Sequence, residues 1–291
     1  MKKLLACVLS LTMVLSFTAC SSSSGSSTTT AAPVSSAAAT EAAETTEAAQ
    51  EADSDAINGP EDLAGKKIGV QEGTTGDIYV SGDFEEDYPD TVLRYKTGYE
   101  AVQALLTDKV NCVVIDDQVA QSFVEANEGL KILETAYTDE EYALYINSDQ
   151  EELLEQVNAA IAELQENGVL DDIIAYYIDE DETASAYQAQ TSESFPNGTL
   201  DIAVNPYFPP YEYYEGEEIW GIDADMCRAI GDILGMEVTF SAMDFTASLT
   251  AVQTGKNLMA MGGITVTEDR AAAGLFSITY YNGKQVIIVK E

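Results

Sequence analysis

The residues that could take part in chemistry are mainly carboxylates, because the chain contains 51 Asp and Glu, 13 Lys and Arg, and no His. Without His, neither a Ser-His-Asp nor a Cys-His nucleophile system can form, and His-containing metal sites are excluded. The formal net charge of −38 argues against nucleic acid, whose phosphates require a basic surface, and against an anionic membrane face. The composition leaves an acidic α/β protein that binds a small molecule.

Two polar stretches follow short apolar strands and are candidates for a binding site. Gln71–Asp77 follows a strand at 67–70 and places Thr and Gly where a loop opens a helix. Asp116 and Asp117 follow Val110–Ile115, an apolar run typical of a strand buried on both faces. Strand C-termini and helix N-termini are the usual ligand positions in α/β sheets.

The elements that must position these residues are predicted from hydrophobic periodicity. Helices are expected at 99–107, 153–164, 170–177, 222–233 and 245–254, and further strands at 142–146, 200–204, 237–240, 259–261 and 285–289. Ala101–Ile115 and Ala251–Met261 are similar in sequence, each with Ala-Val-Gln, a polar turn containing Lys and an apolar strand. This internal similarity predicts two similar lobes around a shared cleft. Residues 179–198 are acidic and polar and are predicted to form a linker.

The first residues are typical of a secretory signal. Lys2 and Lys3 precede the uncharged run Leu4–Ala19, whose 16 residues are short for a membrane span of about 20. A signal peptide over 1–19 is therefore favoured over a transmembrane anchor. Ser21–Asn58 consists largely of Ser, Thr, Ala and Glu without aromatic residues, which predicts a disordered tether.

Several short segments in each half carry a resemblance to a known family. In the second half they are Phe208–Glu212 (FPPYE), Gly221–Asp225 (GIDAD), Met243–Phe245 (MDF), Ala251–Lys256 (AVQTGK) and Gly263–Arg270 (GITVTEDR). In the first half they are Glu61–Val70 (EDLAGKKIGV), Gly73–Asp77 (GTTGD), Val113–Asp117 (VVIDD) and the helices between Glu151 and Tyr177. The chain resembles the bacterial extracellular solute-binding proteins of family 3, which serve polar amino-acid ABC transporters.

The resemblance implies an α/β, two-lobe periplasmic-binding-protein-like (type II) fold with the ligand cleft between the lobes. The order of the halves is reversed, so the chain resembles a circular permutant of the family. The implied organisation is a signal peptide (1–19), a lipidated Cys and tether (20–59), lobe 2 (60–142), lobe 1 (143–178 plus 199–291) and a linker (179–198) that joins the family's usual termini. A single crossover near Tyr142–Ile146 would connect the lobes, which predicts a looser hinge than in the family.

The resemblance also assigns ligand-binding roles. Arg270 matches the family's carboxylate-binding Arg, and the Arg side chain presents a planar fork that suits a carboxylate. Thr265 matches a hydroxyl contact to the same carboxylate, and Gly263 a carbonyl contact to the ligand's ammonium group. Thr74 and Thr75 lie in the lobe 2 loop that would close on the carboxylate, with Thr75 making the contact.

Other residues would contact the ligand's ammonium group and its side chain. Asp116 would take the ammonium, with Asp117 as the alternative. Phe208 and Phe245 match aromatic positions that sandwich the ligand side chain. The remaining candidates lie in the loop around Phe208 and would set side-chain preference: Asn205, Tyr211 and Glu212.

The function implied is capture of a polar amino acid by hinge closure, without cofactor or metal, and delivery to an ABC transporter permease. Phe17–Cys20 resembles a lipobox, so Cys20 would carry a lipid and hold a monomeric protein at the extracellular face of the cytoplasmic membrane. Cys112 and Cys227 are then predicted to be buried thiols. The alternatives are a sensing subunit without transport, or a dehydratase-like enzyme on the same fold, in which Glu212 or Asp116 would move protons.

Overall fold

The computed structural model describes residues 56–179, 183–190 and 195–291 of the chain. The predictions for the signal peptide, for Cys20 and for the tether up to residue 55 lie outside the described residues. Every described residue belongs to one unit of the chain, Glu51–Glu291. No described helix is both long enough and apolar enough to span a membrane.

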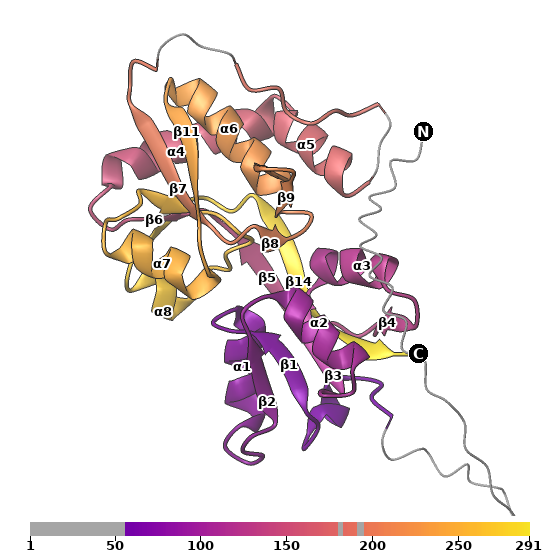
Figure 1. Cartoon of the computed structure of the whole chain (residues 1–291). Coiled ribbons are helices and arrows are strands. Elements are labelled where there is room, and N and C mark those ends of the chain that lie inside the picture. The colour runs from indigo at the N-terminus through magenta and orange to yellow at the C-terminus, as the bar shows by residue number, and fades with distance from the viewer. Residues whose placement is uncertain (1–55, 180–182, 191–194) are drawn as a thin grey trace, which may run out of the picture. The chain divides into compact units, whose positions relative to one another are not determined.

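The first sheet contains strands from both ends of the described chain (Figure 1). Its strands are β1 (Ile68–Gln71), β2 (Val92–Tyr95), β3 (Cys112–Asp116), β4 (Leu130–Ile132), β5 (Thr138–Tyr142) and β14 (Tyr281–Lys290). The order is β2-β1-β3-β14-β4, and β5 also pairs with β14. β1 runs parallel to β2 and β3, whereas β14 is antiparallel to β3, β4 and β5.

The second sheet has the order β11-β7-β12-β6-β13. Its strands are β6 (Tyr145–Ile146), β7 (Thr199–Val204), β11 (Glu237–Ala242), β12 (Met259–Ala260) and β13 (Leu275–Phe276). β7 is parallel to β11 and β12, and β6 is antiparallel to β12 and β13. A separate small sheet consists of β8 (Tyr207–Phe208), β9 (Glu212–Glu215) and β10 (Glu218–Trp220).

Helices pack on both faces of each large sheet. They are η1 (Pro60–Leu63), α1 (Thr75–Phe84), α2 (Gly98–Leu106), α3 (Asp117–Ala126), α4 (Glu151–Glu166), α5 (Val169–Tyr177), α6 (Ile222–Leu234), α7 (Phe245–Gln253) and α8 (Glu268–Ala271). In β3, Val113 and Ile115 pack in the cluster that contains α2 and α3 residues, whereas Cys112 and Val114 pack with Val80 of α1. Both faces are therefore buried, as the uninterrupted apolar run predicts.

Most expected elements form within a few residues of their predicted bounds, and the two-lobe α/β fold is confirmed. The helix predicted at 153–164 ends at Asn167, and Gly168 adopts the left-handed conformation before α5 begins. Cys112 and Cys227 are buried free thiols, as predicted.

The expected boundary of lobe 1 at residue 291 is wrong. Tyr281–Lys290 forms β14, which lies between β3 on one side and β4 and β5 on the other, so it belongs to lobe 2 (Figure 1). The apolar run that marks this strand does not reveal which sheet it joins, because strand pairing depends on distant segments. Lobe 2 therefore comprises residues 57–142 and 281–290, and lobe 1 comprises residues 145–178 and 199–276.

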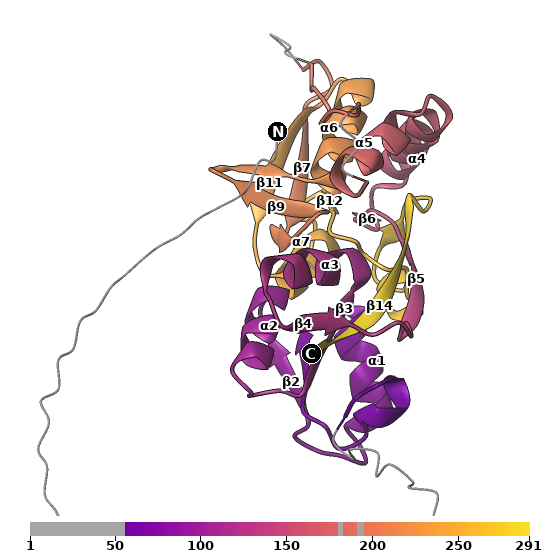
Figure 2. The same ribbon diagram turned by 90° about the vertical axis from the view of Figure 1, so that its right-hand side faces the viewer.

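The expected single crossover is also wrong. One connection runs from β5 to β6, and a second runs from β13 to β14. The two are hydrogen-bonded to each other, from Ser277 N to Leu144 O (3.0 Å), from Leu144 N to Ser277 Oγ (2.9 Å), and from Tyr280 N to Tyr142 O (3.0 Å). β5 and β14 continue side by side into lobe 2 (Figure 2). The basis for predicting an unusually loose hinge is therefore lost.

The predicted linker packs in part on lobe 1. Tyr187 donates from its backbone N–H to Asp225 (2.9 Å) and from its hydroxyl to Asp232 (2.9 Å), and both acceptors belong to α6. Gln190 N also donates to Asp232 (2.8 Å). The described part of the linker is thus bonded along one helix of the lobe whose strands follow it.

Candidate ligand-binding site

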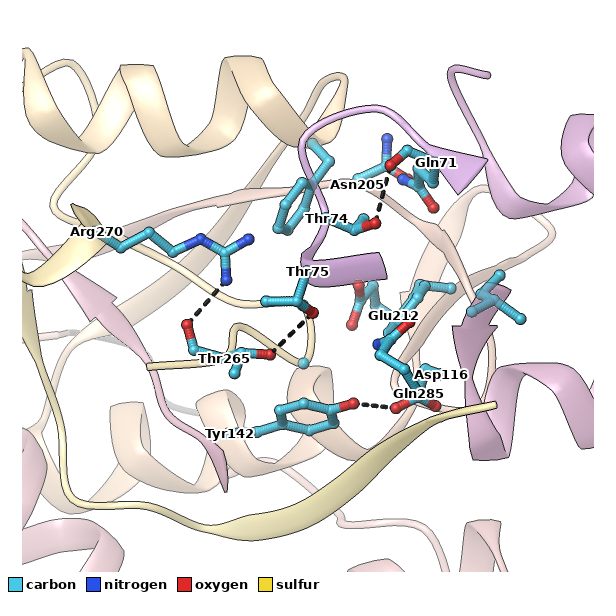
Figure 3. A pocket seen from close by; sticks show the side chains of 15 residues that line it. Gln71, Thr74, Thr75, Asp116, Tyr142, Asn205, Glu212, Thr265, Arg270 and Gln285 are labelled. Carbon is cyan, nitrogen blue, oxygen red and sulfur yellow. Dashed lines mark hydrogen bonds between the residues drawn. The ribbon is translucent and has the colours of Figure 1, made fainter. Parts of the chain in front are cut away.

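The candidate site is a pocket lined by residues of both lobes (Figure 3). Its empty volume, counted with the space open to solvent, is about 430 Å³. Ten of the eleven predicted ligand-binding residues line it: Thr74, Thr75, Asp116, Asn205, Phe208, Glu212, Phe245, Gly263, Thr265 and Arg270. The sequence segments that suggested them are therefore brought together by the fold.

Arg270 lies in the short helix α8 and is only 7% exposed. Its Nη1 donates to Thr265 O (2.8 Å) and its Nη2 to Gly73 O (3.1 Å), and its guanidinium carbon lies 5.5 Å from the ring centre of Phe245. No described Asp or Glu forms an ion pair with this guanidinium, although carboxylates outnumber cations in the chain. Burial lowers the pKa of Arg270, because the charged form loses hydration. Arg270 is thus a buried cation that offers donors to an anion.

The two Thr residues expected to contact the same carboxylate meet across the lobes. Thr75 is the first residue of α1, and its Oγ1 lies 3.5 Å from Oγ1 of Thr265. Thr74 is the N-cap of α1 and donates its hydroxyl to Gln71 O (2.9 Å). The N-terminus of the ten-residue helix α1 therefore lies at the pocket, where its dipole favours an anion.

Asp116 lies at the end of β3, 1% exposed, and also caps α3. Its Oδ1 accepts from the N–H groups of Gln118 (3.0 Å) and Val119 (3.1 Å), and its Oδ2 accepts from the hydroxyl of Tyr142. Burial is the main cause that raises its pKa well above 3.8, followed by repulsion from Asp117. Asp117 is not among the lining residues. The structure thus places Asp116, and not its neighbour, in the pocket.

Sequence reasoning assigned no ligand contact to three polar lining residues, two of which come from the strands that continue the crossovers. Tyr142 ends β5, Gln285 lies in β14, and Gln71 ends β1. Gln285 donates to Glu140 Oε2 (2.9 Å), and Gln71 accepts from Gly98 N (3.2 Å). Gln71 begins the candidate stretch 71–77, whereas the only local signal for the other two is a Gln before the apolar run 286–289.

Tyr211 corrects the prediction, because it does not line the pocket. It is fully buried, its ring stacks on Phe208 with centroids 5.6 Å apart, and it makes an edge contact with Tyr142 at 5.6 Å. A residue in a binding loop can face either the ligand or the core, and its type does not distinguish these orientations. Tyr211 therefore packs against Phe208, and Phe208 lines the pocket.

Asp223 holds the backbone of one pocket wall in place. Its Oδ2 accepts from Gly262 N (2.9 Å), Gly263 N (3.0 Å) and the hydroxyl of Tyr280 (2.7 Å). Gly262 and Gly263 line the pocket, whereas Tyr280 belongs to the second crossover. One buried carboxylate thus joins the pocket wall to the second crossover.

Asp223 also gives a testable pH dependence of stability. Burial raises its pKa from 3.8 to about 6, so the folded state binds this proton more tightly than the unfolded state does. Stability from this group is present below pH 4 and is lost as the pH rises through 6, a change of about 3 kcal/mol. We expect Asp223→Asn to flatten the fall in unfolding free energy between pH 4 and 6, measured by urea unfolding. A variant that kept the wild-type slope would contradict this assignment.

Residues 200–291 match the sequence family described as bacterial extracellular solute-binding proteins, family 3. The predicted resemblance is confirmed for this part of the chain. The two-lobe α/β arrangement is the periplasmic-binding-protein-like (type II) fold expected for that family.

Two curated relatives are similar over part of their length. The arginine-binding extracellular protein ArtP of Bacillus subtilis is 31% identical over 92 residues, covering 32% of this chain and 36% of ArtP. The L-cystine-binding protein TcyJ of Escherichia coli is 30% identical over 119 residues, covering 39% and 42%. The chain therefore spans about two fifths of the length of these relatives, and both are binding proteins by name.

Among solved structures, the phosphate-binding protein of a Streptococcus pneumoniae ABC transporter is similar at 9% identity. It covers 78% of this chain and 89% of its own, with a TM-score of 0.42.

Proposed function

We propose that this protein captures one polar α-amino acid in the pocket between its lobes. The observation that carries the proposal is the buried guanidinium of Arg270, which faces the pocket without an ion-pair partner among the described residues. A planar guanidinium pairs a carboxylate with two hydrogen bonds. Asp116, at the opposite end of the pocket, supplies a carboxylate for the ammonium group (Figure 3). An amino acid carries both groups at a fixed separation.

The mechanism proposed is closure of the two lobes around the ligand. Arg270 and Thr265 belong to lobe 1, whereas Thr75 and Asp116 belong to lobe 2. A ligand that touches both sets binds the closed form more tightly than the open form, so it shifts the population toward closure. The paired crossovers are the segments that would bend. Asp223 would couple their movement to the pocket wall, because it accepts hydrogen bonds from Tyr280 and from Gly262 and Gly263.

The transport role is supported by the named relatives. ArtP binds arginine and TcyJ binds cystine by name, and a glutamine-binding protein of an ABC transporter in Bacillus subtilis is 25% identical over 118 residues. We propose delivery of a polar amino acid to an ABC permease by a monomer anchored through a lipid on Cys20 at the extracellular face of the membrane.

We also propose that the two halves stand in permuted order. Residues 200–291, which match the family, follow the strands β1 to β5, yet β14 from their end lies between β3 and β4. The end of β14 and the segment that begins at η1 would then be consecutive in an unpermuted relative. The linker 179–198 would be the new connection.

A ligand screen tests the function. The twenty amino acids and cystine, each at millimolar concentration, should include at least one that raises the unfolding temperature by about 5–10 °C, as expected at roughly 100 times the dissociation constant. The chain rejoined in the other order, 199–291 followed by 56–178, should bind the same amino acid. A screen in which no amino acid stabilises the protein would refute the proposed function.

A further inference from the structure

Glu212 is a buried carboxylate that the amino-acid backbone of the proposed ligand does not use. It begins β9, is 1% exposed and lines the pocket (Figure 3). Within the described ranges no group donates a hydrogen bond to it or forms an ion pair with it, and its Oε2 is fully buried. A carboxylate in this position is unfavourable unless a donor or a cation reaches it.

Two amide side chains that line the same pocket as Glu212 also hold unpaired oxygens. Oδ1 of Asn205 and Oε1 of Gln285 are also buried, and no described group donates to either. The amide nitrogen of each residue already donates one of its two N–H groups, to Met243 O (3.1 Å) and to Glu140 Oε2 (2.9 Å). The unpaired oxygens of Glu212, Asn205 and Gln285 therefore favour a ligand group that carries several N–H donors.

The backbone opposite Glu212 leaves room for its carboxylate. Gly262 has φ +138°, a conformation that L side chains rarely adopt, and a Cβ there would lie 2.8 Å from Glu212 Oε1. Asp223 fixes this glycine through the 2.9 Å bond from Gly262 N. The space beside the carboxylate is thus part of the built pocket.

We propose that Glu212 binds a cationic side chain of the captured amino acid, a guanidinium or an ammonium group. The proposal rests on the proposed function, because Arg270 and Asp116 must first hold the ligand's backbone groups. A guanidinium carries five N–H donors and no acceptor, so it suits pairing with the Glu212 carboxylate. A neutral side chain leaves the carboxylate unpaired, and an acidic one is repelled by it.

The test compares L-arginine with L-citrulline, which has nearly the same shape and no charge, by calorimetry on the full-length protein. The wild type should bind arginine about 100-fold more tightly than citrulline, because citrulline leaves the buried carboxylate without a cation. Glu212→Gln should lose about 100-fold in arginine affinity and keep that for citrulline within about threefold. Glu215→Gln, which removes the same charge from an exposed position of β9, should bind arginine as the wild type does.

The outcomes separate this inference from the proposed function. Citrulline or glutamine binding as tightly as arginine to the wild type would overturn the role of Glu212 and leave amino-acid capture intact. Unchanged arginine affinity in Glu212→Gln would overturn it as well. Failure of every amino acid to bind would refute the function itself. If Glu212→Gln does not fold, the comparison of arginine with citrulline on the wild type decides the question.

Discussion

Replacing Arg270 by Ala should weaken binding of the captured amino acid by about 100-fold or more. Arg270 is buried, and its guanidinium is the group that would compensate the ligand's carboxylate inside the pocket. Removing one member of a buried ion pair costs about 3–5 kcal/mol, because the other charge stays buried without compensation. Arg270→Lys keeps the charge but cannot form the bidentate hydrogen bonds to a carboxylate, so we expect an intermediate loss of affinity. Calorimetry with the amino acid identified by the screen measures both.

Arg270→Ala should leave the ligand-free protein folded. Burial lowers the pKa of Arg270, which means that the fold holds this charge at a cost when no anion is present. The unfolding temperature without ligand should therefore change little, while the stabilisation by ligand disappears. Arg228→Ala is the matched control, because Arg228 is paired with Asp225 (2.8 Å) and lies outside the pocket. Near-normal affinity in Arg270→Ala would show that the carboxylate is bound elsewhere.

Replacing Asp116 by Asn should also reduce affinity by about 100-fold, because it removes the carboxylate that would pair with the ligand's ammonium. Asn is a good N-cap, so its side-chain oxygen can still accept from Gln118 and Val119 and preserve the start of α3. The variant therefore isolates the charge from the helix cap. Calorimetry in two buffers gives a second readout. Burial raises the pKa of Asp116, so binding of an ammonium to the wild type should release a proton, and less should be released in the variant.

Asp117→Asn is the control for Asp116, since it makes the same change one residue further along the chain. Asp117 is partly buried and its Oδ1 accepts from Gln118 N (2.9 Å), but its side chain does not line the pocket. We expect its affinity to stay within about threefold of the wild type. A larger loss in Asp117→Asn than in Asp116→Asn would assign the ammonium to Asp117.

The sequence alone predicted most of the elements, and most of the predicted ligand-binding residues line one pocket. Val110–Ile115 reads as a buried strand because both faces need apolar residues, and the Asp that follows must then lie at a strand end, where helices and ligands meet. Arg270, Thr265 and Thr75 were found through short motifs. Patterns of this kind are local, so they can be recognised whatever the order of the two halves along the chain.

Only the tertiary structure decided which strands pair and what surrounds each charge. β14 is apolar and could have completed either sheet, and its place beside β3 depends on residues about 170 positions away. Tyr142 and Gln285 reach the pocket because the two crossovers run together. That Arg270 and Glu212 have no ion-pair partner among the described residues also follows from packing, because an ion pair depends on which distant side chains share a buried space. The sequence determined which charges are present, and the fold decided which of them remain available to a ligand.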